Sequence, residues 1–98
     1  FWVGTIFEPR NADAAEMFVL DKGQVRKVWS GGMTVSNGLG FSPDKRTMYH
    51  ADTSTHRIDR FDFDAATGAI SEPQPFQRFS TDKKALDYGG RPDGAAVV

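Results

Sequence analysis

The stretch VSNGLGFSPDKRTMYHAD, from Val35 to Asp52, decides how the chain folds, because it holds two turn signals close together. Asn37-Gly38 is the first, and an Asn-Gly pair flanked by alternating apolar residues is the strongest short hairpin signal. Residues 43–46, with the sequence Pro-Asp-Lys-Arg, are the second. Turning at both places would leave only residues 39–42 as a strand. Either that strand is very short, or one of the two signals does not turn the chain.

Short extended segments recur on both sides of this stretch. They are broken by Gly, Pro, Asp and Asn at roughly 8- to 12-residue spacing, which is typical of antiparallel β-proteins. Residues 12–17 have some helical propensity, but so short a segment cannot sustain a helix alone. The predicted fold class is therefore all-β, with a polar loop over residues 81–90. The predicted strands cover residues 1–6, 16–21, 24–29, 39–42, 47–51, 57–64 and 76–80, and a last strand starts at Asp93.

One short pattern occurs twice along the chain. Asn37-Gly38 precedes Leu-Gly-Phe, and 56 residues later Asp93-Gly94 precedes Ala-Ala-Val. Each copy is a short side chain with an oxygen, then Gly, then a small or apolar strand, and three strand candidates lie between the copies. Four short strands per repeat is typical of a propeller blade. We therefore predict about two four-stranded blades of a β-propeller, in which residues 1–34 end one blade, 35–90 form a full blade and 91–98 begin the next.

Both ends of the sequence are apolar and extended. Residues 1–6 read as the middle of a strand, and residues 95–98 form an apolar run without a closing turn. Such ends leave unpaired backbone and bare apolar surface. A propeller also needs at least about four blades. We expect the remainder of a propeller chain to complete the domain.

Composition excludes several classes of partner. Twelve basic and thirteen acidic residues give a net charge of −1 without a basic run, which argues against nucleic-acid binding. No apolar stretch approaches the length that spans a membrane. The absence of Cys excludes a disulfide scaffold and a thiolate metal site. We expect neither a nucleic-acid nor a membrane partner. The absence of Cys does not fix the compartment, for which our expectation is the cytoplasm.

The two copies of the pattern indicate where chemistry could occur. The first strand of each propeller blade lines the central channel, so Asn37 and Asp93 are expected to converge there from neighbouring blades. Side-chain oxygens are the ligands that hard divalent cations take. The following Gly allows the backbone to approach closely. Taken singly, Asn-Gly and Pro-Asp-Gly are common turns, so a turn and a metal site both remain open readings.

Several motifs together resemble the gluconolactonase/regucalcin (senescence marker protein) family. The resemblance covers essentially the whole chain, in the right order and spacing. It implies a six-bladed β-propeller that binds one divalent cation in its channel, and many members hydrolyse sugar lactones. The motifs are Phe1 to Ile6, Val35 to Leu39, Phe41 to Asp44, Thr47 to Tyr49 with Ala51-Asp52, Arg60 to Asp64 with Thr67-Gly68, and Arg91 to Gly94.

The resemblance implies roles for three residues. Asn37 matches a metal-binding Asn, and Asp93 matches a metal ligand that is also the proposed catalytic general base. Glu8 lies near the position of an acidic residue that contacts substrate. A third metal ligand, a Glu of the first blade, lies outside this sequence, as does an upstream substrate-contacting segment. The implied cofactor is one divalent cation, Ca²⁺, Zn²⁺ or Mn²⁺.

The implied function is metal-dependent hydrolysis of a sugar lactone to the aldonic acid. Two alternatives remain open at this point. One is a calcium-binding propeller protein without turnover. The other is a related metal-dependent propeller esterase or phosphotriesterase.

Other polar residues are predicted to be structural. His50 and His56 flank a turn at a blade edge, and Asp52 is expected to cap that turn rather than to bind a metal. Ser36 and Ser42 have no evident His and acid partners in the sequence and no nucleophile elbow.

Asp59, Asp62 and Asp64 imitate a run of metal ligands, but a solvated strand face is favoured over a calcium loop, which needs a suitably placed Gly. Trp2, Trp29 and the Phe residues are expected to pack between blades.

Overall fold

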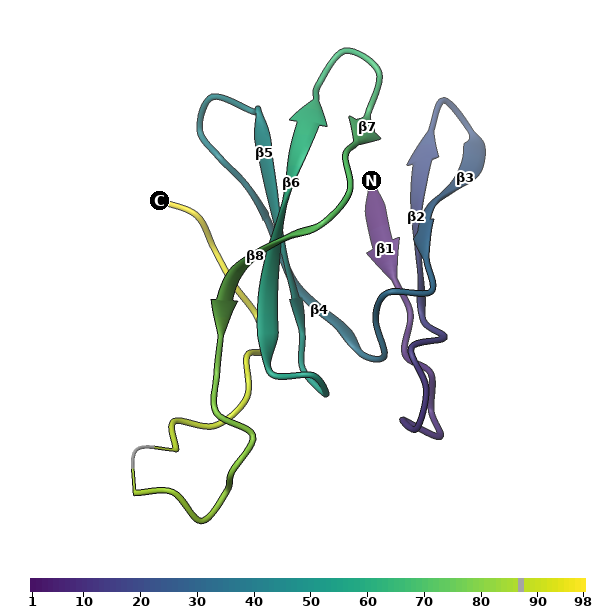
Figure 1. Ribbon diagram of the computed structural model, residues 1–98. Coiled ribbons are helices and arrows are strands. Elements are labelled where there is room, and N and C mark those ends of the chain that lie inside the picture. Colours follow the sequence, from purple (N-terminus) through teal and green to yellow (C-terminus); the bar gives the residue numbers. More distant parts are fainter. Residues whose placement is uncertain (87) are drawn as a thin grey trace.

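The computed structural model describes residues 1–86 and 88–98 and shows two antiparallel sheets (Figure 1). Position 87, within the predicted loop 81–90, lies outside the described residues. The first sheet has the order β1-β2-β3, and the second has the order β4-β5-β6-β7, with β8 also paired to β6. The strands are β1 (Trp2–Gly4), β2 (Glu16–Asp21), β3 (Gln24–Ser30), β4 (Ser36–Phe41), β5 (Thr47–Asp52), β6 (Arg57–Asp64), β7 (Ala69–Ile70) and β8 (Gln74–Arg78). The described residues contain no helix, so the all-β prediction is confirmed.

The second turn signal forms the hairpin between β4 and β5. The Ser42 N–H donates to the carbonyl of Thr47 at 2.9 Å. The Asp44 side chain accepts from the Ser42 hydroxyl at 2.6 Å and from the Arg46 N–H at 3.0 Å. These two hydrogen bonds, the Ser42 one first, hold the pKa of the Asp44 carboxyl below its ordinary value of 3.8. Lys45 completes the turn with a φ of 59°.

The first turn signal does not reverse the chain. Ser36 pairs with Asp52 and Leu39 pairs with His50, so Asn37 and Gly38 together oppose a single residue of β5. This arrangement is a β-bulge, which inserts one residue into a strand and redirects the neighbouring side chains. Asn-Gly therefore serves β4 as a bulge rather than as a hairpin turn.

The alternating sequence of β6 places its side chains on two different faces. Phe61 is 1% exposed, whereas Asp62 and Asp64 are exposed, as predicted. The prediction for Asp59 is wrong, because this residue shares the buried face with Phe61 and is 5% exposed. A charged residue on that face needs a partner, and Arg57 supplies it at 2.9 Å.

The predicted last strand is replaced by a segment that runs beside β4. The Gly38 N–H donates to the Asp93 carbonyl at 2.9 Å. Further on, a Cβ atom added to Gly40 would lie 2.8 Å from Val97 Cγ2. The start of the segment is thus hydrogen-bonded to β4, but residues 93–98 carry no strand assignment because they join no continuous ladder among the described residues.

Aromatic side chains join the two sheets. Trp2 of β1 contacts Phe41 and Phe63 of the second sheet, with ring centroids 5.8 and 6.0 Å apart. Trp29 of β3 meets Phe61 edge to face at 4.9 Å. Each such pair contributes about 0.5–1.5 kcal/mol beyond its burial. The predicted packing role of both Trp residues is borne out, and the buried core between the sheets consists of Ala15, Met17, Met33, Met48 and Phe61.

Replacing Phe61 by Ala is expected to lower the free energy of unfolding of the full-length protein by about 3–5 kcal/mol, because it leaves a cavity beneath Trp29. Val25→Ala on β3 is the control, since Val25 is 69% exposed and its loss should change stability by less than about 0.5 kcal/mol. Urea unfolding followed by fluorescence measures both. Equal effects of the two substitutions would contradict the assigned core.

Candidate functional site

Asn37 lies in the bulge of β4 and is half-buried. Its Nδ2 donates to Thr53 Oγ1 at 3.0 Å, and its Oδ1 lies 3.0 Å from the N–H of Gly38. Thr53 follows the last residue of β5. The side-chain amide is therefore held on both sides by groups of the second sheet.

Pro92 and Asp93 lie beside the bulge of β4 and the Thr53 side chain. Thr53 Oγ1 donates to the Pro92 carbonyl at 2.7 Å, and the Gly38 N–H donates to the Asp93 carbonyl at 2.9 Å. A Cβ at Gly38 would collide with that carbonyl oxygen, so this close approach requires Gly. Asn37 and Asp93, far apart in sequence, are thus brought together at the start of β4, and Asp93 is exposed.

Glu8 lies in the connection between β1 and β2. Its carboxylate is 3.7 Å from the Arg10 guanidinium, and the Glu8 side chain is 77% exposed. Ile6 forms a β-bridge with Val35, and the Phe7 N–H donates to the Thr34 carbonyl at 2.9 Å. These contacts place the connection at the end of the molecule where β4 begins (Figure 1). An interaction of Glu8 with substrate remains a prediction.

The donor atoms of Asn37 and Asp93 fit a hard divalent cation, which prefers amide and carboxylate oxygens. Within residues 1–86 and 88–98, no group of three or more His, Asp or Glu side chains comes together to hold a metal ion. The two residues would therefore supply part of a coordination sphere. The resemblance places a further ligand, a Glu, outside this sequence.

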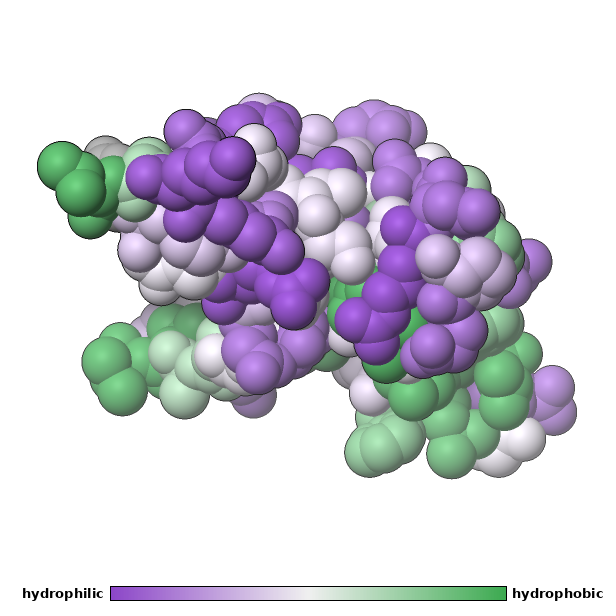
Figure 2. Space-filling model, turned by 90° about the horizontal axis from the view of Figure 1, so that it is seen from below, coloured by the Kyte–Doolittle hydropathy of each residue, from purple (hydrophilic) through white to green (hydrophobic). Residues whose placement is uncertain are grey.

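The end of the molecule that carries the start of β4 is largely hydrophilic. Figure 2 shows this face with hydrophilic residues across its middle and upper part, and with hydrophobic residues at the left, at the lower right and between the hydrophilic ones near the centre. Among the described residues, no helix is long and apolar enough to cross a membrane.

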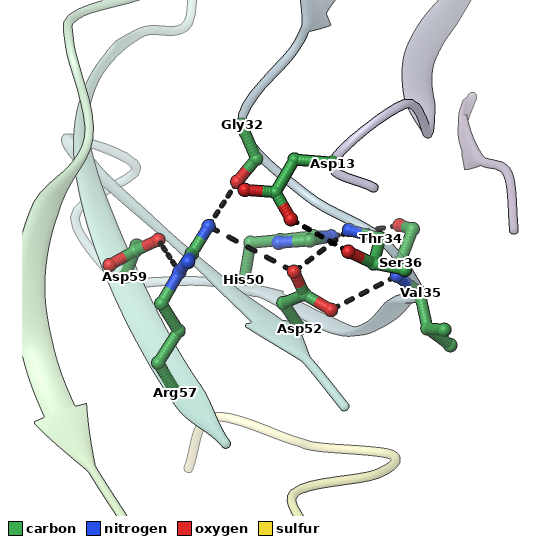
Figure 3. A network of polar contacts seen from close by, with 9 residues as sticks. All are labelled: Asp13, Gly32, Thr34, Val35, Ser36, His50, Asp52, Arg57 and Asp59. Carbon is green, nitrogen blue, oxygen red and sulfur yellow. Dashed lines mark hydrogen bonds and ion pairs between the residues drawn. The ribbon is translucent and has the colours of Figure 1, made fainter. Parts of the chain in front are cut away.

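A buried polar network holds the segment that leads into β4 (Figure 3). Asp52, which is 1% exposed, accepts the N–H groups of Thr34 at 2.9 Å and Val35 at 3.0 Å. Arg57 lies 3.9 Å from Asp52 and also donates to the Gly32 carbonyl. The predicted turn cap is wrong, because the Asp52 carboxylate binds backbone N–H groups 17 and 18 residues away in the sequence rather than groups of the turn that follows it. Removing one partner of a buried ion pair typically costs about 3–5 kcal/mol, so this network is a strong constraint.

The role of Arg57 was missed by the sequence analysis. Arg57 begins β6 directly opposite Asp52 at the end of β5, so the pair faces across the strands. The sequence does hold a signal for this ion pair, since the acidic Asp52 and the basic Arg57 stand on either side of a short turn. Asp59 lies two residues further along the same face and completes the group at 2.9 Å from Arg57.

Ser36 has a His neighbour that was not evident in the sequence, but no His and acid pair in the described part of the chain. Ser36 Oγ lies 2.8 Å from His50 Nε2, across the β4–β5 pair. Within the described residues, however, His50 Nδ1 has no hydrogen-bond partner, so no acid completes a triad. His50 is buried, with its ring edge-on to Trp29 at 5.3 Å, and does not lie at a blade edge as predicted. The pair packs between the sheets, which is a structural position.

Burial lowers the pKa of His50 from its ordinary value of 6.5 to about 4, although Asp52 and Asp59 oppose the shift. Between these two pH values the unfolded chain binds a proton that the folded protein does not. The free energy of unfolding is therefore expected to fall as the pH drops from about 6.5 to about 4, by roughly 3 kcal/mol at most. Chemical unfolding of the full-length protein at a series of pH values measures this loss.

His50→Gln tests the assignment, because Gln keeps a hydrogen-bonding group for Ser36 and does not titrate. The variant should lose stability less steeply than the original protein between pH 6.5 and 4. Identical slopes would show that His50 is not the group responsible.

Residues 1–97 match the family described as the SMP-30/gluconolactonase/LRE-like region. A 6-deoxy-6-sulfogluconolactonase of Pseudomonas putida is 38% identical over 96 residues, which cover 98% of this chain and 31% of that protein. A pentonolactonase of Haloferax volcanii is 27% identical over 89 residues, 91% of this chain and 28% of that protein. The chain thus spans about a third of the length of these relatives.

Two solved structures share the fold. A luciferin-regenerating enzyme superposes with a TM-score of 0.80 at 28% identity, over 97% of this chain and 31% of that one. A calcium-binding protein, regucalcin, from Agrobacterium tumefaciens superposes with a TM-score of 0.79 at 29% identity, over 97% and 30%. The β-propeller class predicted from the sequence is confirmed by these matches.

Proposed function

The chain belongs to the SMP-30/gluconolactonase/LRE-like family, and from this we propose that the full-length protein hydrolyses a sugar lactone to its aldonic acid with one divalent cation. The observation that carries the proposal is the meeting of Asn37 and Asp93 at the start of β4, through the hydrogen bonds of Gly38 and Thr53. The names of the lactonase relatives support the substrate class.

In this proposal, Asn37 Oδ1 and the Asp93 carboxylate would hold the cation, and the Glu outside this sequence would complete the protein ligands. A bound divalent cation supplies Lewis acidity, which polarises a carbonyl and stabilises the oxyanion that develops on it. Asn37 contributes an oxygen without a charge, so the cation keeps more of its positive character than it would among three carboxylates.

Asp93 acts as the general base. Its exposed carboxylate accepts a proton from a water molecule while the water oxygen attacks the lactone carbonyl carbon. The acyl carbon–oxygen bond of the ring then breaks, and the ring oxygen takes up a proton to become a hydroxyl. One water is consumed and one aldonic acid is formed. Glu8 accepts hydrogen bonds from sugar hydroxyls at the hydrophilic end of the molecule.

Calcium binding without turnover is the second candidate. It is favoured by the similarity to the calcium-binding regucalcin, which superposes as well as the luciferin-regenerating enzyme does. The proposed ligands would serve both functions. Turnover of a lactone therefore separates the candidates, while metal binding alone does not.

Asp93→Ala is expected to abolish lactone turnover and to weaken cation binding, because it removes both the base and a ligand. Asn37→Ala should chiefly weaken cation binding, so that excess cation restores much of its activity. Asp62→Ala is the matched control, since Asp62 is an exposed carboxylate on the outer face of β6. Hydrolysis is measured by acid release at constant pH, and binding by calorimetry. Normal activity of Asp93→Ala would contradict the proposed mechanism.

The substrate class is tested on the full-length protein after chelation and reloading with Ca²⁺, Mn²⁺ or Zn²⁺. An aldonolactone, an aryl lactone and a phosphotriester are compared above their spontaneous hydrolysis. Aldonolactone turnover supports the proposal, and phosphotriester turnover supports the related hydrolase instead. Cation binding without any turnover supports the calcium-binding candidate.

Glu8→Gln is expected to raise the KM for the lactone several-fold while leaving cation affinity unchanged, because the carboxylate is proposed to contact the sugar and not the ion. Glu72→Gln is the control, because Glu72 is an exposed carboxylate in the connection between β7 and β8. Steady-state kinetics and calorimetry separate the two effects. An unchanged KM would remove Glu8 from the substrate site.

A further inference from the structure

We propose that Thr53 is a positioning residue that fixes the side-chain amide of Asn37 so that its oxygen, and not its NH₂ group, is presented to the cation. This inference rests on the proposed function, since it concerns the same metal site. It assigns a task to a residue that is neither a ligand nor a base.

Thr53 is itself rigidly placed. It follows Asp52, whose carboxylate is fixed by the N–H groups of Thr34 and Val35. Its own N–H donates to the Val35 carbonyl at 3.2 Å. The hydroxyl therefore starts from a backbone that is hydrogen-bonded to the segment leading into β4.

The direction of the hydrogen bonds follows from counting protons. A Thr hydroxyl has one proton and two lone pairs, and a Pro residue offers only its carbonyl as an acceptor. The proton of Thr53 is used for the Pro92 carbonyl at 2.7 Å. Thr53 Oγ1 can then only accept from Asn37, which lies 3.0 Å away. Because the two ends of an amide are nearly identical in shape, this chain of hydrogen bonds determines which end faces Thr53.

The oxygen end of Asn37 agrees with this orientation. Oδ1 lies 3.0 Å from the Gly38 N–H, which also donates to the Asp93 carbonyl at 2.9 Å. The amide oxygen has a second lone pair, which remains for a cation. In the flipped orientation the NH₂ group would meet the Gly38 N–H, donor against donor, and would repel a cation. Both ends of the amide thus favour one orientation.

Thr53 also links the two proposed ligands. It contacts the side chain of Asn37 on β4 and the carbonyl of Pro92, the residue before Asp93. Ser at this position could make both hydrogen bonds. Val has nearly the shape of Thr but can make neither hydrogen bond. Thr53→Val therefore measures the effect of losing the hydroxyl while the packing is kept.

The test is calcium binding by calorimetry to the full-length, chelator-treated protein, a readout that does not depend on activity. Thr53→Val should weaken binding about tenfold, as is usual when a group that orients a metal ligand is lost. Thr53→Ser should bind within about twofold of the original protein. Thr55→Val is the matched control, because Thr55 lies in the same turn and its buried hydroxyl has no hydrogen-bond partner among the described residues. Thermal unfolding verifies that each variant is folded, and Thr53→Ala replaces the Val variant if the latter is not.

The double variant Thr53→Val with Asn37→Ala decides how Thr53 acts. If Thr53 works through the amide, the double variant binds no more weakly than Asn37→Ala alone. A further tenfold loss in the double variant would overturn the inference, as would unchanged binding by Thr53→Val. In either case the proposed function stands as long as Asn37→Ala and Asp93→Ala weaken binding. It falls if these two variants also bind calcium as the original protein does.

Discussion

The two hydrogen bonds from the Thr34 and Val35 backbone to the Asp52 carboxylate are the constraint on which the site depends. They tie the segment before β4 to the end of β5. Arg57 lies 3.9 Å from the buried Asp52 carboxylate, and it also contacts Asp59 and the Gly32 carbonyl (Figure 3). An apolar residue in place of Asp52 would leave two backbone donors and a guanidinium without their partner. The bulge at Asn37 begins only two residues beyond Val35.

The fold could largely be predicted from local sequence because its signals are local. The turn at residues 43–46 and the alternation of Asp62 and Asp64 with Phe61 each depend on a few neighbouring residues. The repeat of a polar residue before Gly predicted that Asn37 and Asp93 lie close together, which neither motif alone would have indicated. Of the two turn signals between Val35 and Asp52, only residues 43–46 reverse the chain, because Asn37-Gly38 forms a bulge within β4.

The remaining features depend on register and on contacts between sheets, which local patterns do not contain. Asp59 reads as a solvated residue until β6 is seen to place it beside Arg57. Ser36 and His50 become partners only through the register that the bulge shifts. The short strand β7 follows from its pairing with the end of β6, at Phe63 and Asp64, and its own two residues carry no strong strand signal. Thr53 lies in the turn that follows β5, and only the folded structure places its hydroxyl beside the Pro92 carbonyl.

The contact between Gly38 and Asp93 also bears on the order in which the protein folds. The hairpins of the second sheet join neighbours in sequence, so their loops close at little entropic cost and can form early. The hydrogen bond from Gly38 to Asp93 closes a much longer loop, which contains the whole of β5, β6, β7 and β8. The contact between the two proposed ligands is therefore expected to form later than the hairpins. A cation that binds there would report the completion of tertiary structure, and would stabilise the late-docking segment against local unfolding.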